Sequence, residues 1–196
     1  MDDSAKLAAL GLPLARTVYG WLGLDRRGNW LIKGERISNP RIADYLGRHY
    51  ICDDSGRWYV ENGLQQVFVA LEYTPFVLRV AGLAGKFPRL VTHDGRPVIT
   101  VRGAWLDETG SLVLQTEHGA GVIDDRDLER VLPCFRGPGQ SMLDEDALAS
   151  AIERLQIERE DAALLFRYHG RAVPMAPIAS NAIPARFGFV REPGGA

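Results

Sequence analysis

The stretch Asp25-Arg26-Arg27-Gly28-Asn29-Trp30 decides how this chain begins to fold. The same spacing of an Asp, a Gly and a large apolar residue recurs at Asp53-Asp54-Ser55-Gly56-Arg57-Trp58 and at Asp107-Glu108-Thr109-Gly110-Ser111-Leu112. Each copy separates two runs of alternating apolar residues, which is the pattern of a β-hairpin. The Asp side chain accepts hydrogen bonds from the backbone just ahead of it, and Gly takes a positive φ without steric cost. The motif therefore predicts three tight turns and, by itself, no chemistry.

The composition of the chain bounds its class. Its 196 residues, 46% of them hydrophobic, suffice for one compact domain or two small subdomains. A net charge of −2, from 23 basic and 25 acidic residues, argues against a nucleic-acid partner. The short apolar stretch at residues 7–14 is interrupted by Pro13, so it predicts neither a signal peptide nor a membrane span. We expect a cytoplasmic protein with no nucleic-acid and no membrane partner.

Metal or cofactor chemistry is not indicated by the sequence. Cys52 and Cys134 form no CxxC pair, and no nucleophile motif such as Gly-x-Ser-x-Gly occurs. The Gly-rich stretch at residues 81–86 does not match a phosphate-binding loop and is read as a linker. No two histidines have metal-ligand spacing on one predicted element. The four are His49, His93, His118 and His169. We therefore expect no metal and no cofactor.

The clearest predicted element is a helix over Pro40–Arg48. Asn39 suits its N-cap, and Pro40 suits the first helical position, where an N–H would have no partner. Ile42, Tyr45 and Leu46 form one apolar stripe, which must pack on a sheet. The alternating pattern that follows predicts strands at 49–52, 57–61, 64–72 and 76–80.

The second half repeats the order of the first after a Gly-containing break at residues 81–88. Residues 21–32 match residues 105–114, and the helix over Pro40–Arg48 matches a short helix predicted at 126–132. Internal similarity of this kind is typical of a duplicated unit. Because hairpins are common and short matches arise by chance, duplication and coincidence both stay open.

The remaining chain is predicted to be an appendage. The Ser141-x-x-Asp144 pattern predicts a helix over 142–156, and a strand follows at 162–168. Pro174, Pro177 and Pro184 suit an extended surface segment better than a central strand.

The predicted fold class is therefore α+β, with two related hairpin–helix–antiparallel-sheet units, a C-terminal helix and an extended tail. In each unit a curved sheet packs on a helix. The expected division is an N-terminal α+β unit at 1–85, a second hairpin–helix unit at 86–136, and a helix, strand and Pro-rich tail at 137–196 that pack on the second unit.

Four segments and the helix that begins at Pro40 carry a resemblance to a known family. The segments are Asp25–Trp30, Lys33–Ile37, Trp58–Val60 and Glu72–Phe76. Over residues 24–80 the chain resembles a family of uncharacterised proteobacterial proteins known only as a domain of unknown function. The resemblance implies two α+β units and a role in signalling or ligand sensing, and it implies no enzymatic activity. Beyond residue 85 the hairpin–helix order persists without matching residues.

The leading functional prediction is a non-enzymatic module that binds a small ligand or a partner peptide. The ligand would lie in a strand-lined groove between the halves. Aromatic and Arg side chains recur beside the turns and are the predicted ligand contacts. They are Trp30, Arg36, Arg57, Trp58 and Arg102.

Two alternatives stay open. The first is an enzyme in which His49 with Asp53, or His118 with Asp124, meet in three dimensions as an acid–base pair. The second is a structural homo-oligomer, in which an exposed edge strand or the Pro-rich tail packs on another copy of the chain.

Overall fold

The computed structural model describes residues 11, 13, 15–85, 87–158 and 164–194. The chain divides into two compact units. Unit 1 comprises residues 1–75, 93–95 and 184–196, and unit 2 comprises residues 76–92 and 96–183. The mixed α+β class is confirmed. None of the helices in the described ranges is long and apolar enough to cross a membrane.

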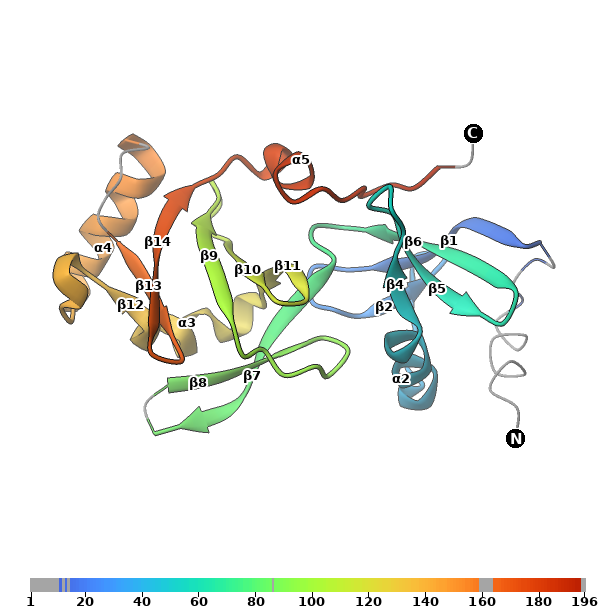
Figure 1. The fold of residues 1–196 in the computed structure, drawn as a ribbon, viewed down its shortest axis with the longest axis horizontal. Coiled ribbons are helices and arrows are strands. Elements are labelled where there is room, and N and C mark those ends of the chain that lie inside the picture. The colour runs from blue at the N-terminus through green and yellow to red at the C-terminus, as the bar shows by residue number, and fades with distance from the viewer. Residues whose placement is uncertain (1–10, 12, 14, 86, 159–163, 195–196) are drawn as a thin grey trace. The chain divides into compact units, whose positions relative to one another are not determined.

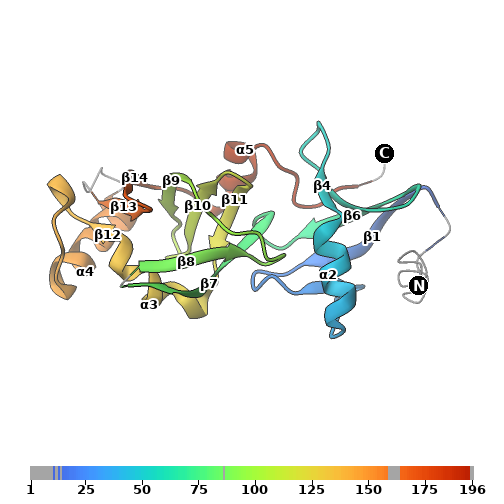
Figure 2. The ribbon, with the colours of Figure 1, turned by 60° about the horizontal axis from the view of Figure 1, so that its bottom comes forward.

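Unit 1 is a six-stranded sheet with one helix. The strands are β1 (Thr17–Leu24), β2 (Trp30–Ile32), β3 (Glu35–Arg36), β4 (Tyr50–Cys52), β5 (Trp58–Asn62) and β6 (Gln65–Leu71), in the order β3-β2-β1-β6-β5-β4. Helix α2 (Pro40–Arg48) has the predicted bounds and lies across this sheet (Figure 2). It is capped as predicted, because the Asn39 side chain accepts a hydrogen bond from the Arg41 N–H at 3.0 Å.

An aromatic cluster forms the core of unit 1. Tyr50 is fully buried, and its ring centroid lies 5.2 Å from that of Trp30 and 4.6 Å from that of Trp58. The His93 ring contacts both Trp30 and Tyr50. The Tyr50 hydroxyl donates to the Pro75 carbonyl at 3.1 Å, so the one polar atom of this ring has a partner.

Unit 2 is an eight-stranded sheet with short helices. Its strands are β7 (Phe76–Ala84), β8 (Phe87–Thr92), β9 (Val101–Leu106), β10 (Leu112–Thr116), β11 (Gly119–Ile123), β12 (Phe135–Arg136), β13 (Leu165–Tyr168) and β14 (Arg171–Pro177). Their order is β12-β13-β14-β9-β10-β11-β7-β8 (Figure 1). The helices are α3 (Leu128–Val131), between 3-10 turns at Asp125–Asp127 and Leu132–Cys134, α4 (Glu145–Glu153), and α5 (Ile183–Phe187), which extends into unit 1.

Six strands of unit 2 have the same order and connections as the six of unit 1. In each unit three strands form an antiparallel meander, a helical segment follows, and three more strands form a second meander. The first strand and the last, β1 with β6 and β9 with β14, pair side by side in parallel. The prediction of purely antiparallel sheets is therefore wrong at the centre of both. Parallel neighbours need a long crossover, which the helix and the second meander supply.

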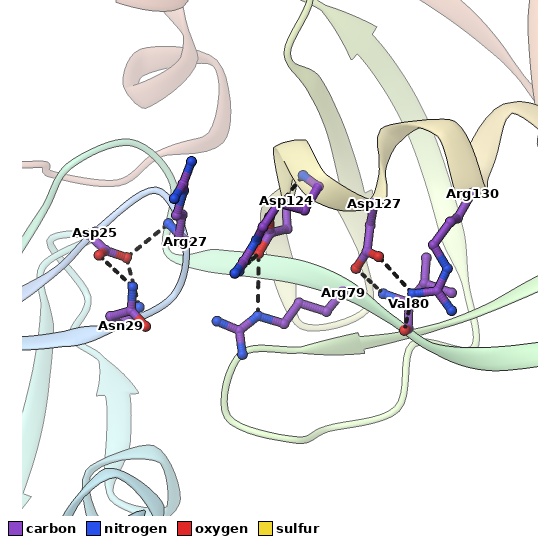
Figure 3. Close-up of polar contacts among 9 residues, drawn as sticks. Asp25, Arg27, Asn29, Arg79, Val80, Asp124, Asp127 and Arg130 are labelled. Atoms are coloured by element: carbon purple, nitrogen blue, oxygen red, sulfur yellow. Dashed lines mark hydrogen bonds and ion pairs between the residues drawn. The ribbon is translucent and has the colours of Figure 1, made fainter. Parts of the chain in front are cut away.

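The three Asp-x-x-Gly turns form as predicted and share one geometry. Asp25 Oδ1 accepts the backbone N–H groups of Arg27 and Asn29 at 2.9 and 2.8 Å (Figure 3). Asp53 and Asp107 bind the N–H groups two and four residues ahead in the same way. Gly28, Gly56 and Gly110 have φ values of 71°, 76° and 84°. Each turn thus joins its two strands through backbone geometry that only Gly adopts at low cost.

The Asp53 turn has a second role within unit 1, because the C-terminal segment lies against it. The N–H of Val190 donates to the Gly56 carbonyl at 2.9 Å, and the N–H of Leu71 donates to the Arg191 carbonyl at 2.7 Å. A Cβ at Gly56 would lie 2.2 Å from the Gly188 carbonyl oxygen. From Pro184 onward the chain belongs to unit 1, although the sequence placed this tail on the second unit.

The Pro-rich segment differs from its prediction, since β14 lies between β13 and β9 rather than along the surface. The N–H of Met175 donates to Leu164 on one side, and that of Ile178 donates to Leu106 on the other. Successive backbone nitrogens of a strand face opposite neighbours. The nitrogen of Pro174 therefore faces β9, one residue before the β14–β9 ladder begins at Met175. The nitrogen of Pro177 faces β13, beyond the end of the β13–β14 ladder. A central strand accommodates both prolines because neither site requires an N–H.

The predicted appendage helix begins later than its pattern, and it continues beyond α4 as a π-helix at Arg154–Glu158. Its N-cap is Asp144, whose carboxylate accepts the Ala147 N–H at 2.8 Å, so α4 begins at Glu145 rather than at Met142. The short helix predicted at 126–132 lies where expected but alternates between 3-10 and α geometry. Pro133 lies in the second 3-10 turn, where its ring and missing N–H prevent α3 from continuing as an α-helix.

A Gly56→Ala substitution should destabilise unit 1 much more than Gly63→Ala does. Both glycines have positive φ, 76° and 59°, so each substitution costs about 1 kcal/mol of backbone strain. Only Gly56 faces backbone within contact distance, whereas nothing lies within 4 Å of a Cβ at Gly63. We expect roughly 1–3 kcal/mol of additional loss from the clash, measured by urea denaturation followed through tryptophan fluorescence. Equal losses of unfolding free energy in the two variants would show that the C-terminal segment does not pack closely against Gly56.

Candidate ligand-binding pocket

Four of the five ligand contacts predicted from the sequence lie in unit 1. Trp30 and Trp58 come together on Tyr50, but they are buried core residues with exposures of 4% and 9%. The guanidinium of Arg57 is bound to the Asp53 carboxylate at 2.8 Å and lies over the Phe68 ring. Arg36 is exposed on the edge strand β3. Arg102 is exposed on β9 of unit 2.

The two acid–base pairs that an enzyme would need do not form among the described residues. The Asp53 carboxylate accepts from the backbone of Ser55 and from Arg57, and its pKa lies below the usual range because of these hydrogen bonds. The imidazole Nε2 of His118 lies 2.9 Å from the Pro97 carbonyl, whereas Asp124 is bound by arginines. Each carboxylate thus supports a local turn or helix start rather than a neighbouring histidine.

A pocket of about 250 Å³ lies in unit 2 between two hairpins, β7–β8 and β13–β14. Figure 1 shows these hairpins side by side. We call this cavity the hairpin pocket. Its lining is mainly apolar, and the described residues of the lining include two arginines and a histidine but no acidic residue. The lining residues are Ala84, Phe87, Pro88, Arg89, Arg167, Tyr168, His169 and Gly170.

The first wall of the hairpin pocket comes from a stretch that the sequence predicted as a break. Residues 81–88 are not a linker: they are the end of β7, a turn at Gly85 with φ 64°, and the start of β8. Leu83 pairs with Pro88 and Ala84 with Phe87 in an antiparallel ladder. The Gly content that suggested a linker serves the turn and a β-bulge between Val80 and Gly82.

Side chains hold β7 in place where its neighbouring strand stops. The parallel ladder between β11 and β7 ends at Leu78, whose carbonyl accepts the N–H of Asp124. Beyond it, the Asp127 carboxylate accepts the Val80 N–H at 2.8 Å, and Arg130 donates to the Val80 carbonyl at 3.0 Å (Figure 3). Asp127 and Arg130 also bind each other at 2.7 Å. The Asp127–Arg130 pair thus supplies the acceptor and the donor that a longer β11 would have offered to Val80, and it orients the β7–β8 hairpin.

Asp124 anchors the same region electrostatically. Its side chain is 2% exposed, and its carboxylate accepts from the Arg126 Nε at 2.9 Å, with the Arg79 Nε at 3.6 Å (Figure 3). The hydrogen bonds and the charge of Arg126 lower the pKa of Asp124 to about 2. The carboxylate therefore stays ionised and caps the 3-10 turn through the Arg126 N–H.

The second wall is the β13–β14 hairpin, which turns at His169-Gly170 as predicted. The two turn residues have φ values of 45° and 81°, the left-handed conformation that two-residue hairpins require. The Tyr168 hydroxyl accepts from the Leu90 N–H and donates to the Val98 carbonyl, both at 3.0 Å. Burial raises the pKa of this phenol. Tyr168 thus fastens one hairpin to the other and places its ring in the lining.

The edge strand β8 offers little to another strand. Leu90 and Thr92, whose N–H groups point away from β7, donate to Tyr168 and to the Arg96 carbonyl. Pro88, on the same side, has no N–H. The oligomer alternative that relied on an exposed edge strand therefore lacks free donors along β8.

Sequence reasoning missed the hairpin pocket because its walls are far apart in the chain. The only local signals were a Phe87-Pro88-Arg89 strand start and an Arg167-Tyr168-His169-Gly170 strand end. Neither stretch predicts a site alone, because only the hydrogen bonds of Tyr168 to Leu90 and Val98 bring them together.

Comparisons with known proteins place the chain among uncharacterised proteins. The family DUF2944, whose description reads "Protein of unknown function (DUF2946)", matches residues 1–194. A crystal structure of a DUF1285 family protein from Silicibacter pomeroyi is similar, with 17% identity, a TM-score of 0.53, and coverage of 82% of this chain and 81% of that one. A DUF1285 family protein from Shewanella baltica has 16% identity and a TM-score of 0.45, over 58% of this chain and 91% of that one. No curated protein matches the sequence. At these identities the likeness to the first structure shows the fold alone.

The stability of unit 2 should depend on the ionised Asp124. Its pKa in the folded chain, about 2, lies below the unfolded value of about 3.9, so the stabilisation is present above about pH 4 and is lost as the pH falls toward 2. Asp124→Asn keeps the capping oxygen but removes the charge. We expect a loss of roughly 1–2 kcal/mol at neutral pH that shrinks as the pH approaches about 3, measured by urea denaturation.

Asp146→Asn is the matched control, because Asp146 is an exposed carboxylate in the first turn of α4. It should change the stability by a few tenths of a kcal/mol. A pH-independent loss in Asp124→Asn would contradict the electrostatic role of Asp124.

Proposed function

We propose that this chain, which belongs to the DUF2944 family of proteins of unknown function, is a non-enzymatic small-ligand-binding module with a regulatory role. The observation that carries the proposal is the hairpin pocket, an apolar cavity with a few polar groups at its border. This combination is the usual form of a small-molecule site. The compartment that we propose is the cytoplasm.

The size of the hairpin pocket limits the ligand. A dry cavity of about 150 Å³ accepts benzene, so one of about 250 Å³ suits a single ring with a short substituent. A long peptide would not fit inside it. Of the two ligand classes predicted from the sequence, a small molecule is therefore better supported for this pocket.

The regulatory role is supported by the way the walls are held. One wall is the β7–β8 hairpin, which depends beyond Val80 on the Asp127–Arg130 pair rather than on a neighbouring strand at β11. The other wall joins it through Tyr168. A ligand that contacts both hairpins would stabilise one arrangement of the two. A protein partner that binds the β7–β8 hairpin in that arrangement would then bind more tightly. We propose Arg36, exposed on β3 of unit 1, and Arg102, exposed on β9 of unit 2, as separate contacts for a protein partner.

We also propose that the two units descend from one duplicated unit. The shared strand order supports this proposal, as does the occurrence of the Asp-x-x-Gly turn at the equivalent hairpins β1–β2 and β9–β10. In unit 2 the β7–β8 hairpin is an addition to the six shared strands. The hairpin pocket lies beside this addition, so the proposed binding role would be specific to unit 2.

Filling the hairpin pocket should abolish small-molecule binding without unfolding the protein. Ala84 lines the pocket at an exposed strand position, so Ala84→Trp adds an indole there. Leu83→Trp is the matched control, since Leu83 is the preceding residue, 56% exposed, and not part of the lining. We expect fragments of about ten non-hydrogen atoms to raise the melting temperature of the wild type and of Leu83→Trp, but not of Ala84→Trp. Fragments that stabilise all three proteins equally would contradict the assignment of the pocket.

A further inference from the structure

We infer that the hairpin pocket takes an amphiphilic monoanion, namely an aromatic or short acyl body with a carboxylate that Arg89 and Arg167 bind. This inference rests on the proposed function and specifies the chemistry of the ligand. It is carried by three features of the pocket: two arginines without acidic neighbours, an apolar interior, and a glycine that positions one arginine.

Arg89 and Arg167 have no carboxylate partner in the described part of the chain, unlike Arg57, Arg126 and Arg130. Arg57, Arg126 and Arg130 bind Asp53, Asp124 and Asp127 at 2.8, 2.5 and 2.7 Å. The guanidinium groups of Arg89 and Arg167 form no ion pair or hydrogen bond with any residue in the described ranges. They reach the pocket from β8 of one hairpin and β13 of the other. Two guanidinium groups that border one cavity without a counter-charge make it a site for an anion.

Gly82 positions the guanidinium of Arg89. A Cβ at Gly82 would lie 3.0 Å from the Arg89 Nη2, so the guanidinium rests directly on the backbone at this point. The φ of Gly82 is not left-handed, and it is therefore the missing side chain rather than the conformation that matters. A guanidinium that packs close to the backbone in this way loses less freedom when it binds a ligand.

The interior of the hairpin pocket accounts for the rest of the ligand. Phe87 is 41% exposed, and the Tyr168 ring is fixed by two hydrogen bonds of its hydroxyl. An aromatic or acyl body would cover the exposed part of Phe87 and release the water there. A carboxylate has a smaller desolvation cost than a doubly charged phosphate in such surroundings, which favours the monoanion.

Isothermal titration calorimetry with phenylacetate tests this inference, with the uncharged isostere phenylacetamide and with phenyl phosphate as comparison probes. We expect phenylacetate to bind about tenfold or more tightly than phenylacetamide, because a charged hydrogen bond contributes more than a neutral one. Arg89→Gln and Arg167→Gln should each weaken phenylacetate about tenfold or more and leave phenylacetamide unchanged. Gly82→Ala, which displaces the Arg89 guanidinium, should weaken phenylacetate in the same direction.

Arg171→Gln is the matched control, because Arg171 is an exposed arginine at the start of β14 that does not line the pocket. It should leave the affinity for phenylacetate unchanged. Equal binding of phenylacetate and phenylacetamide, or an equal loss in Arg171→Gln, would overturn the inference. No binding of phenylacetate at millimolar concentration, or tighter binding of phenyl phosphate, would overturn it as well. If neutral fragments still stabilise the wild type but not Ala84→Trp, the proposed function survives such a failure.

Discussion

Strand β7 continues beyond the end of its neighbour β11. Unit 2 depends on side chains that form hydrogen bonds with the part of β7 that has no strand beside it on that edge. Val80 would otherwise carry a backbone N–H and a carbonyl without strand partners, at a cost of about 1–3 kcal/mol for each buried group. Asp127 and Arg130 satisfy both, while Asp124 caps the 3-10 turn before them. These three residues belong to the helical segment that follows β11. The segment therefore ends β11, and its side chains supply the hydrogen bonds that β7 needs beyond that end.

This arrangement produces the candidate site. Once β7 is supported beyond Leu78, it can pair with β8 in a hairpin, and Tyr168 then fastens the tip of β13 to Leu90 of that hairpin. The space between the two hairpins is the hairpin pocket, with Arg89 and Arg167 on opposite walls. The carboxylates of the helical segment after β11, Asp124 and Asp127, are already bound to Arg79, Arg126 and Arg130. The described lining of the pocket contains no carboxylate, so its two guanidinium groups face the cavity without a counter-charge.

Local signals predicted local features correctly. The Asp-x-x-Gly turns, the Asn39 cap and the helix over Pro40–Arg48 depend on residues within a few positions of each other, so their patterns sufficed. Predictions that required knowledge of neighbours failed. The prolines of β14 indicated a surface segment, because the pattern could not show that each lies where a ladder has not begun or has ended. Trp30 and Trp58, beside their turns, indicated a ligand groove, whereas both are buried against Tyr50 and belong to the core.

The amino-acid sequence by itself determined the turns, the caps and the helix over Pro40–Arg48, because φ preference, side-chain capping and apolar periodicity act over a few residues. Only the tertiary structure decided which strands became neighbours, and with them the parallel centres of both sheets, the docking of the tail on Gly56 and the hairpin pocket. The physical reason is that a strand pairs with whichever backbone satisfies its N–H and carbonyl groups. That partner can lie far away in the chain, as β14 does from β9.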